Sequence, residues 1–152
     1  MRFPALKVRD LEGTDYVIPH ALPGGPHVII VAFQQWHQML VNLWVPGLKA
    51  MAERHQGMEV WEVPSISQGY RLFRGGIDGG MRAGIPAVET RRHTLTAYTD
   101  IGHLARDLEI DSVETIHVFL VDCSGNVLWR AEGEPTDAAL EELENAIPDS
   151  CA

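Results

Sequence analysis

Two stretches of the chain, residues 28–33 and 116–121, are almost continuously apolar and rich in β-branched residues. This composition is typical of strands that are buried on both faces of a sheet. The second stretch is followed by a turn at residues 122–125 and a further β-rich segment at residues 126–131, so these two segments are expected to form a β-hairpin. The two apolar stretches are therefore predicted to form the centre of one sheet.

A helix is predicted after residues 28–33. Apolar residues recur at helical spacing between residues 40 and 51, at Leu40, Trp44, Leu48 and Met51. The helix is expected to reach His55 and to end at Gly57, with a kink where Pro46 removes a backbone donor. Residues 59–63 then predict a strand that is closed by Pro64. Strand, helix and strand at this spacing indicate a βαβ unit with a right-handed crossover.

The remaining elements are less regular. Residues 3–25 indicate extended chain with turns and one short strand at 16–18. Apolar spacing predicts a helix over residues 68–82, although each of the four glycines at positions 75, 76, 79 and 80 lowers helix stability by up to about 1 kcal/mol relative to alanine. Residues 84–89 are expected to form a loop, and residues 94–98 a short strand.

Two more helices are indicated by their N-caps. Asp100 can cap a helix with the apolar residues Ile101, Leu104 and Leu108, and Thr136 can cap another with Leu140, Leu143 and Ile147, stopped by Pro148. The order of elements predicts a single α/β domain over residues 1–152. Its mixed sheet is expected to carry helices on both faces.

Charge and hydropathy exclude several classes of function. The 152 residues carry a formal net charge of −9, which disfavours binding to nucleic acid and to anionic membranes. The longest apolar run is too short to span a bilayer, and no secretory leader pattern precedes the domain. The two cysteines, Cys123 and Cys151, do not form a CxxC motif and are compatible with a reducing compartment. We therefore expect a cytoplasmic protein without membrane insertion.

Three segments resemble the thioredoxin-like superfamily, in its peroxiredoxin-related branch. Residues 10–13 with 22–24 resemble the extended N-terminal arm of that branch. Residues 28–36 resemble the strand that leads to its active-site helix, and residues 119–127 with Gly133 resemble its closing hairpin. The resemblance covers most of the chain and implies a thioredoxin-like mixed sheet.

A closer similarity is to the thioredoxin-like assembly factors of mitochondrial ATP synthase and their bacterial relatives. It rests on residues 80–82 with Ile85, and on residues 118–129 with Gly133. That family is implicated in assembly rather than in catalysis. The resemblance therefore implies another protein as the partner.

The residues that thiol enzymes of this fold require are absent from the expected place. Such enzymes hold a thiolate at the N-terminus of the helix after the first buried strand, where the helix dipole lowers the thiol pKa. The two redox positions fall near Gln38 and Val41, which cannot exchange disulfides. Ile116 stands near the position of the cis-proline of the fold, and a trans bond is expected there. The sequence therefore predicts no catalytic residues of the thiol type.

Cys123 is the one cysteine with a candidate role. It lies in a turn beside Asp122, which would raise the thiol pKa rather than lower it. The simplest interpretation is an incidental turn cysteine, and a disulfide with Cys151 is the alternative. No histidine motif has metal-ligand spacing, so no metal and no cofactor are expected.

Basic and glycine-rich residues gather in the middle of the chain. Five arginines there predict one basic patch: Arg71, Arg74, Arg82, Arg91 and Arg92. The glycines of residues 75–80 offer either an anion cradle that ends at Arg82 or a flexible or closely packed segment. Residues 91–93 are expected to lie on a solvated strand edge.

The leading hypothesis is a redox-inactive thioredoxin-like binding or assembly module. Its binding residues would be Trp36, His37 and Gln38 at the vacant active site, with Arg82, and its ligand a protein segment or a small anion. One alternative is a peroxiredoxin-like thiol oxidoreductase that uses Cys123 or a recruited residue. Another is a structural homodimer that associates through the first helix.

Overall fold

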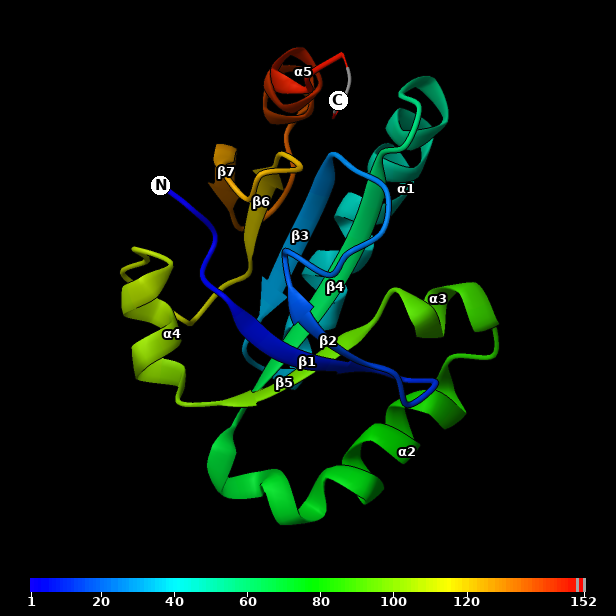
Figure 1. The fold of residues 1–152 in the computed structure, drawn as a ribbon, viewed down its shortest axis with the longest axis vertical. Coiled ribbons are helices and arrows are strands. Elements are labelled where there is room, and N and C mark those ends of the chain that lie inside the picture. The colour runs from blue at the N-terminus through cyan, green and yellow to red at the C-terminus, as the bar shows by residue number, and fades with distance from the viewer. Residues whose placement is uncertain (150, 152) are drawn as a thin grey trace.

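The computed structural model describes residues 1–149 and residue 151. They form a mixed sheet of seven strands in the order β2-β1-β5-β4-β3-β6-β7 (Figure 1). The strands are β1 (Leu6–Asp10), β2 (Asp15–Ile18), β3 (His27–Ala32), β4 (Glu59–Ser67), β5 (Leu95–Thr99), β6 (His117–Val121) and β7 (Val127–Glu132). The strands β3, β4 and β5 run parallel to one another, and β6 and β7 close the sheet as an antiparallel hairpin.

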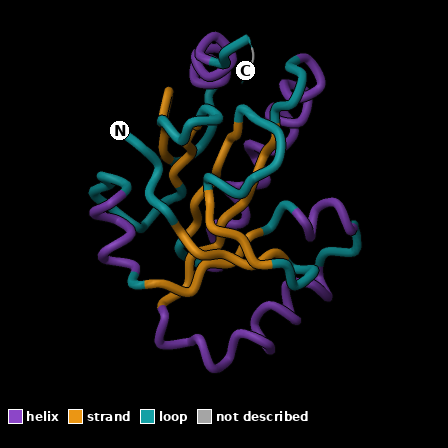
Figure 2. Tube along the Cα trace, viewed as in Figure 1, coloured by secondary structure: helices purple, strands orange, loops and turns teal. Residues whose placement is uncertain are grey.

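The helices connect the strands and cover the sheet (Figure 2). The α-helices are α1 (Gln38–Arg54), α2 (Arg74–Gly84), α3 (Val88–Arg92), α4 (Ile101–Asp107) and α5 (Asp137–Ala146), and the short 3-10 helices are η1 (Gln35–His37) and η2 (Gln68–Phe73). Asp100 and Thr136 cap α4 and α5 as expected, by accepting the backbone N–H groups of His103 and Ala139. No helix of the described residues is long and apolar enough to cross a membrane.

The two faces of β3 divide the core. Val28 and Ile30 pack with α1 and α5, including Trp44 and Leu143. Ile29 and Val31 point to the opposite face, where they pack with residues of α4 and of the N-terminal strands. This alternation follows from the two-residue repeat of a strand. The expected mixed α/β sheet with helices on both faces is therefore confirmed.

The N-terminal segment and β4 differ from the expectation. Residues 6–10, expected to be extended chain, form β1, which pairs with both β2 and β5. The strand expected to close at Pro64 continues to Ser67. It continues because Pro64 pairs with Ala32, the last residue of β3, and the following residues pair with β5 instead.

The segment between β4 and β5 is helical but divided. The helix expected over residues 68–82 consists of η2 and then α2, and α3 begins inside the expected loop of residues 84–89. Neither η2 nor α2 buries a side chain fully, in contrast to α1 and α5. The helix α2 lies toward the end of the molecule opposite to α5, and α3 lies at the side of the molecule (Figure 1).

Candidate functional site

The N-terminus of α1, where a thiol enzyme of this fold would hold its thiolate, is closed by His37. The imidazole is fully buried. Its Nδ1 accepts hydrogen bonds from the backbone N–H groups of Phe33 (3.0 Å) and Gln34 (3.2 Å), so the ring proton is on Nε2, 3.0 Å from the carbonyl oxygen of Glu114. His37 therefore joins the turn after β3 to the segment before β6. Its ring, which was predicted to contact a ligand, is instead buried inside the protein.

Trp36 points in the other direction. Its side chain is 51% exposed, and its ring lies edge-on to His37 at 4.5 Å between ring centroids. Met39 and Leu43 on α1 are also exposed, at 62% and 52%. We call Trp36, Met39 and Leu43 the Trp36 stripe. Trp36 lies on η1, and Met39 and Leu43 lie on the first turns of α1. Three large apolar side chains exposed along this helical segment are unusual for a surface without a partner.

A cleft of about 770 Å³ lies beside the Trp36 stripe and is called here the α1–α2 cleft. Gln38, Asn42 and Lys49 of α1 line one wall. These residues lie next to the Trp36 stripe, because successive residues of an α-helix are 100° apart around its axis. The floor contains Glu62 of β4, and the opposite wall contains Met81 of α2. The exposed amide of Gln38 thus belongs to the cleft.

Glu62 is the most unusual group of the cleft. It lies on a central strand, where it pairs with Ile30 on one side and bridges Thr94 on the other. Burial raises the pKa of the Glu62 carboxyl, while a hydrogen bond from the Gln38 amide (3.2 Å) and the charges of Lys49 and His93 act in the opposite direction. Ionised Glu62 is therefore incompletely compensated by the protein.

His93 forms one edge of the same cleft. Its ring stacks on Trp61, at 4.4 Å between centroids, and its Nε2 lies 2.8 Å from a carboxylate oxygen of Glu59. Its Nδ1 lies 2.8 Å from the carbonyl oxygen of Glu89. His93 is thus engaged by Glu59 and is not free to pair with Glu62.

Arg82 lies on the other side of α2. It lines a smaller hollow of about 280 Å³ between α2 and the β1–β2 turn, and its guanidinium is 3.4 Å from Glu12. The structure thus places Trp36, His37 and Gln38 next to one another but with their side chains in three environments, and it does not bring Arg82 to them. The glycine-rich residues 75–80 lie within α2, whose N–H groups beyond the first turn are bonded within the helix, which does not favour the anion-cradle alternative.

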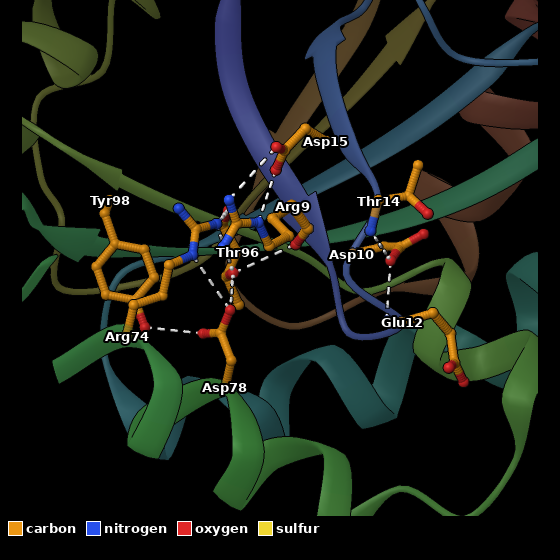
Figure 3. Close-up of polar contacts among 9 residues, drawn as sticks. All are labelled: Arg9, Asp10, Glu12, Thr14, Asp15, Arg74, Asp78, Thr96 and Tyr98. Carbon is orange, nitrogen blue, oxygen red and sulfur yellow. Dashed lines mark hydrogen bonds and ion pairs between the residues drawn. The ribbon is translucent and has the colours of Figure 1, made fainter. Parts of the chain in front are cut away.

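Figure 3 shows the polar network that holds α2 to the sheet beside this hollow. Asp78 accepts hydrogen bonds from the hydroxyls of Thr96 (2.9 Å) and Tyr98 (2.8 Å) and pairs with Arg74 at 3.3 Å. Burial, together with the hydrogen bond to Asp78, raises the pKa of Tyr98, so its phenol remains a donor. The Asp10 carboxylate accepts two backbone N–H groups of the β1–β2 turn. This network compensates for the lack of fully buried side chains on α2.

The expected basic patch is largely neutralised. Arg74 pairs with Asp78, and Glu12 pairs with both Arg82 and Arg91. Residues 91–93 lie at the end of α3 rather than on the expected strand edge. Arg91 also donates to the backbone oxygens of Ile85 and Pro86, which holds it against the protein. The arginines therefore act mainly within the protein.

The two cysteines are joined to each other at the far end of the sheet. Cys123 and Cys151 form a disulfide, so the interpretation of Cys123 as an incidental turn cysteine is wrong. The bond lies against Gly25, where a Cβ atom would be 2.5 Å from the Cys123 sulfur. Gly25 precedes β3 and Trp36 follows it. Because β3 is roughly 17 Å long, the disulfide lies at the end of this strand away from Trp36. Disulfides are typical of oxidising compartments, so the cysteines no longer support the expectation of a reducing one.

The structure also defines the peptide bond before Ile116 and the surroundings of His117. The cis peptide bonds of the described residues precede Pro19 and Pro26, so the bond before Ile116 is trans as expected. His117 is buried and hydrogen-bonded to the carbonyl oxygen of Ser112, and burial lowers its pKa. Among residues 1–149 and 151, no group of three or more metal-ligating side chains comes together.

Glu62 is the site residue that sequence reasoning missed. The signal was present, since a charged residue stands between the apolar residues Trp61 and Val63 of the predicted strand. A parallel strand at the centre of a sheet is normally apolar throughout. A carboxylate in that position marks a place where the sheet is open to solvent or to a ligand.

Comparison with solved structures shows a thioredoxin-like fold. A thiol:disulfide interchange protein from Bacteroides sp. superposes with a TM-score of 0.61 at 15% identity, over 96% of this chain and 88% of that one. BsSco, a member of the Sco family of cytochrome c oxidase assembly proteins, superposes with a TM-score of 0.62 at 13% identity, over 95% and 92% of the two chains. A thioredoxin-like protein from Aeropyrum pernix gives 0.51 at 18% identity, over 94% and 89%.

Sequence comparisons add no family to this result. No family model matches the chain, and no curated protein is significantly similar to it in sequence. The protein thus has the thioredoxin-like fold that its sequence predicts, in a mixed sheet that it shares with thiol-disulfide oxidoreductases of low sequence identity.

Proposed function

We propose that this chain is a thioredoxin-like protein-binding module that works without thiol chemistry. The observation that carries the proposal is that apolar side chains at the start of α1 take the place of a reactive thiol. An exposed apolar stripe stands where a thiol enzyme would hold its thiolate, and both cysteines are engaged at the other end of β3. The binding surface is the Trp36 stripe together with the mouth of the α1–α2 cleft.

The chemistry of this surface favours a protein segment over a small anion. Tryptophan and methionine are enriched at the centres of protein interfaces. The cleft beside them contains the carboxylates of Glu59, Glu62 and Glu89, which would repel an anionic ligand. A protein segment instead covers the apolar stripe and enters the cleft.

An assembly role is consistent with this surface. The sequence resembles assembly factors of mitochondrial ATP synthase, and BsSco is described as a member of a family of cytochrome c oxidase assembly proteins. Both likenesses are distant, and they support a role in which the fold binds another protein rather than the identity of that protein.

The experiment is a selection of short random peptides displayed on phage against the intact protein. The affinities of selected peptides are then measured for the wild type, for Trp36→Ala and for Leu128→Ala, which removes an exposed apolar side chain from β7. Trp36→Ala should weaken binding roughly tenfold or more, and Leu128→Ala should not. Selected peptides that bind Trp36→Ala as tightly as the wild type would overturn the proposal.

A further inference from the structure

The floor of the α1–α2 cleft holds a carboxylate that the protein does not neutralise. Glu62 is on the central strand β4, and its side chain accepts one hydrogen bond, from the Gln38 amide, among the bonds of the described residues. An ionised carboxylate has about four lone-pair sites for donors. Most of the solvation that Glu62 loses on burial is thus not replaced from within the chain.

The charges around Glu62 leave the cleft acidic. Glu53 of α1, Glu59 of β4 and Glu89 of α3 line it as well. His93 is committed to Glu59 at 2.8 Å, so the remaining cation of the lining is Lys49. Lys49 is exposed on α1, where solvent screens its charge. The cleft therefore attracts a cation.

The walls of the cleft are suited to the stem of a long side chain. Val45, Met58, Val60, Met81 and Ile85 contribute apolar surface between the carboxylates. Lysine and arginine bury their methylene stems on such surface while the charged end reaches a polar partner. The volume of about 770 Å³ exceeds that of one side chain, so part of the attached backbone also fits.

One wall of the cleft leaves space for a backbone. Gly80 of α2 lines the cleft, and a Cβ atom at this position would meet nothing within 4 Å. Its φ angle is not positive, so neither packing nor backbone conformation within the chain requires glycine there. Glycine leaves this position of the lining without a side chain, at a cost in helix stability, and Gly76 and Gly79 on the same helix also meet open space.

We propose that the α1–α2 cleft receives a lysine or arginine side chain of a bound protein segment, with the Glu62 carboxylate as its ionic partner. The inference rests on the proposed protein-binding function and names the chemistry of the partner. A guanidinium or ammonium group supplies the donors that Glu62 lacks, and its stem lies on the apolar walls. The Trp36 stripe holds the neighbouring residues of the same segment.

The first test uses small probes instead of an unknown partner. The ¹⁵N-labelled intact protein is titrated with Nα-acetyl-arginine methylamide, Nα-acetyl-lysine methylamide and the uncharged Nα-acetyl-norleucine methylamide, and backbone amide shifts are followed by NMR. The cationic probes should shift the amide signals of Glu62 and Met81 in a saturable, salt-sensitive manner. Glu62→Gln should weaken this at least roughly tenfold, and Glu134→Gln, at an exposed site outside the cleft, should not. Equal shifts by the norleucine probe, or unchanged binding to Glu62→Gln, would overturn the inference.

The second test separates this inference from the proposed function. Peptides selected on the intact protein should contain lysine or arginine and lose affinity for Glu62→Gln. Gly80→Ala narrows the cleft and should weaken them, whereas Gly76→Ala, on the same helix but outside the cleft lining, should not. Peptides that need Trp36 but neither a cationic residue nor Glu62 would overturn the cation site and leave the binding module intact. Peptides that are indifferent to Trp36 would overturn the binding module, and the small probes still decide the cation site.

Discussion

The Nε2 atom of His37 lies 3.0 Å from the carbonyl oxygen of Glu114, and this contact closes the place where thioredoxin-like thiol enzymes hold a reactive sulfur. The same ring accepts two backbone N–H groups of the turn after β3. His37 is thus a structural residue of the site, whereas its neighbour Trp36 faces solvent. The two adjacent residues should respond differently to substitution.

His37→Ala is expected to lower the free energy of unfolding by about 2–4 kcal/mol, because it removes a fully buried side chain that bonds three partly buried backbone groups. Trp36→Ala should cost about 1 kcal/mol or less, because half of the side chain is already exposed. Urea denaturation of both variants measures the difference. Equal losses for the two variants would contradict the division of roles between them.

Glu62→Gln is expected to stabilise the fold at neutral pH. Burial raises the pKa of Glu62, so the folded protein binds a proton more readily than the unfolded chain. Stability should therefore decrease as the pH rises from the unfolded pKa through the folded pKa, and the ionised form costs stability above that range. The charged groups that face Glu62 are Glu53, Glu59, Glu89, Lys49 and His93. The gain from Glu62→Gln should vanish at pH values below the unfolded pKa of glutamate.

Glu144→Gln is the matched control, for which the change in stability at neutral pH should have the opposite sign. Hydrogen bonds from Arg54 and His55 lower the pKa of Glu144, so its contribution to stability is present above the unfolded pKa and is lost as the pH falls through the folded pKa. Removal of this carboxylate should destabilise the protein at neutral pH. Thermal melts of both variants at acidic and neutral pH test the signs, and a loss of stability for Glu62→Gln at neutral pH would contradict the account of the cleft.

Reduction of the Cys123–Cys151 disulfide should lower the free energy of unfolding by about 3.5 kcal/mol. The bond closes a loop with a sequence separation of 28 and so restricts the unfolded chain. Denaturation curves with and without dithiothreitol measure the loss, and the double variant Cys123→Ser with Cys151→Ser should not respond to the reductant. Two free thiols in the unreduced, denatured protein would show that the bond is absent.

Local patterns predicted the centre of the fold. The apolar stretches at residues 28–33 and 116–121 became β3 and β6, because runs of β-branched residues have few alternatives to a buried strand. The Asp100 and Thr136 caps were equally local signals. The strand β1 was missed although Leu6, Val8 and Asp10 alternate toward the interior, because its pairing with β5 joins residues far apart in sequence.

The candidate site depended on contacts that the sequence does not display. The absence of cysteine near Gln38 was visible directly, but the burial of His37 follows from its contact with Glu114, 77 residues away. The disulfide likewise joins cysteines that are 28 residues apart in sequence and lie against the loop at Gly25. Arg82 was assigned to the site as the donor that would end an anion cradle at residues 75–80, whereas here α2 is held to the sheet by Asp78 and Arg82 lies 3.4 Å from Glu12.

The measurement that tests the central claim most directly is the rate of dithiothreitol-dependent insulin reduction and of peroxide reduction by the intact protein. The wild type is compared with the double variant Cys123→Ser with Cys151→Ser. If the chain binds proteins without thiol chemistry, both rates should equal those of the double variant at every protein concentration. Turnover that rises with wild-type protein and is lost in the double variant would show that the disulfide is a redox centre, and would contradict the account.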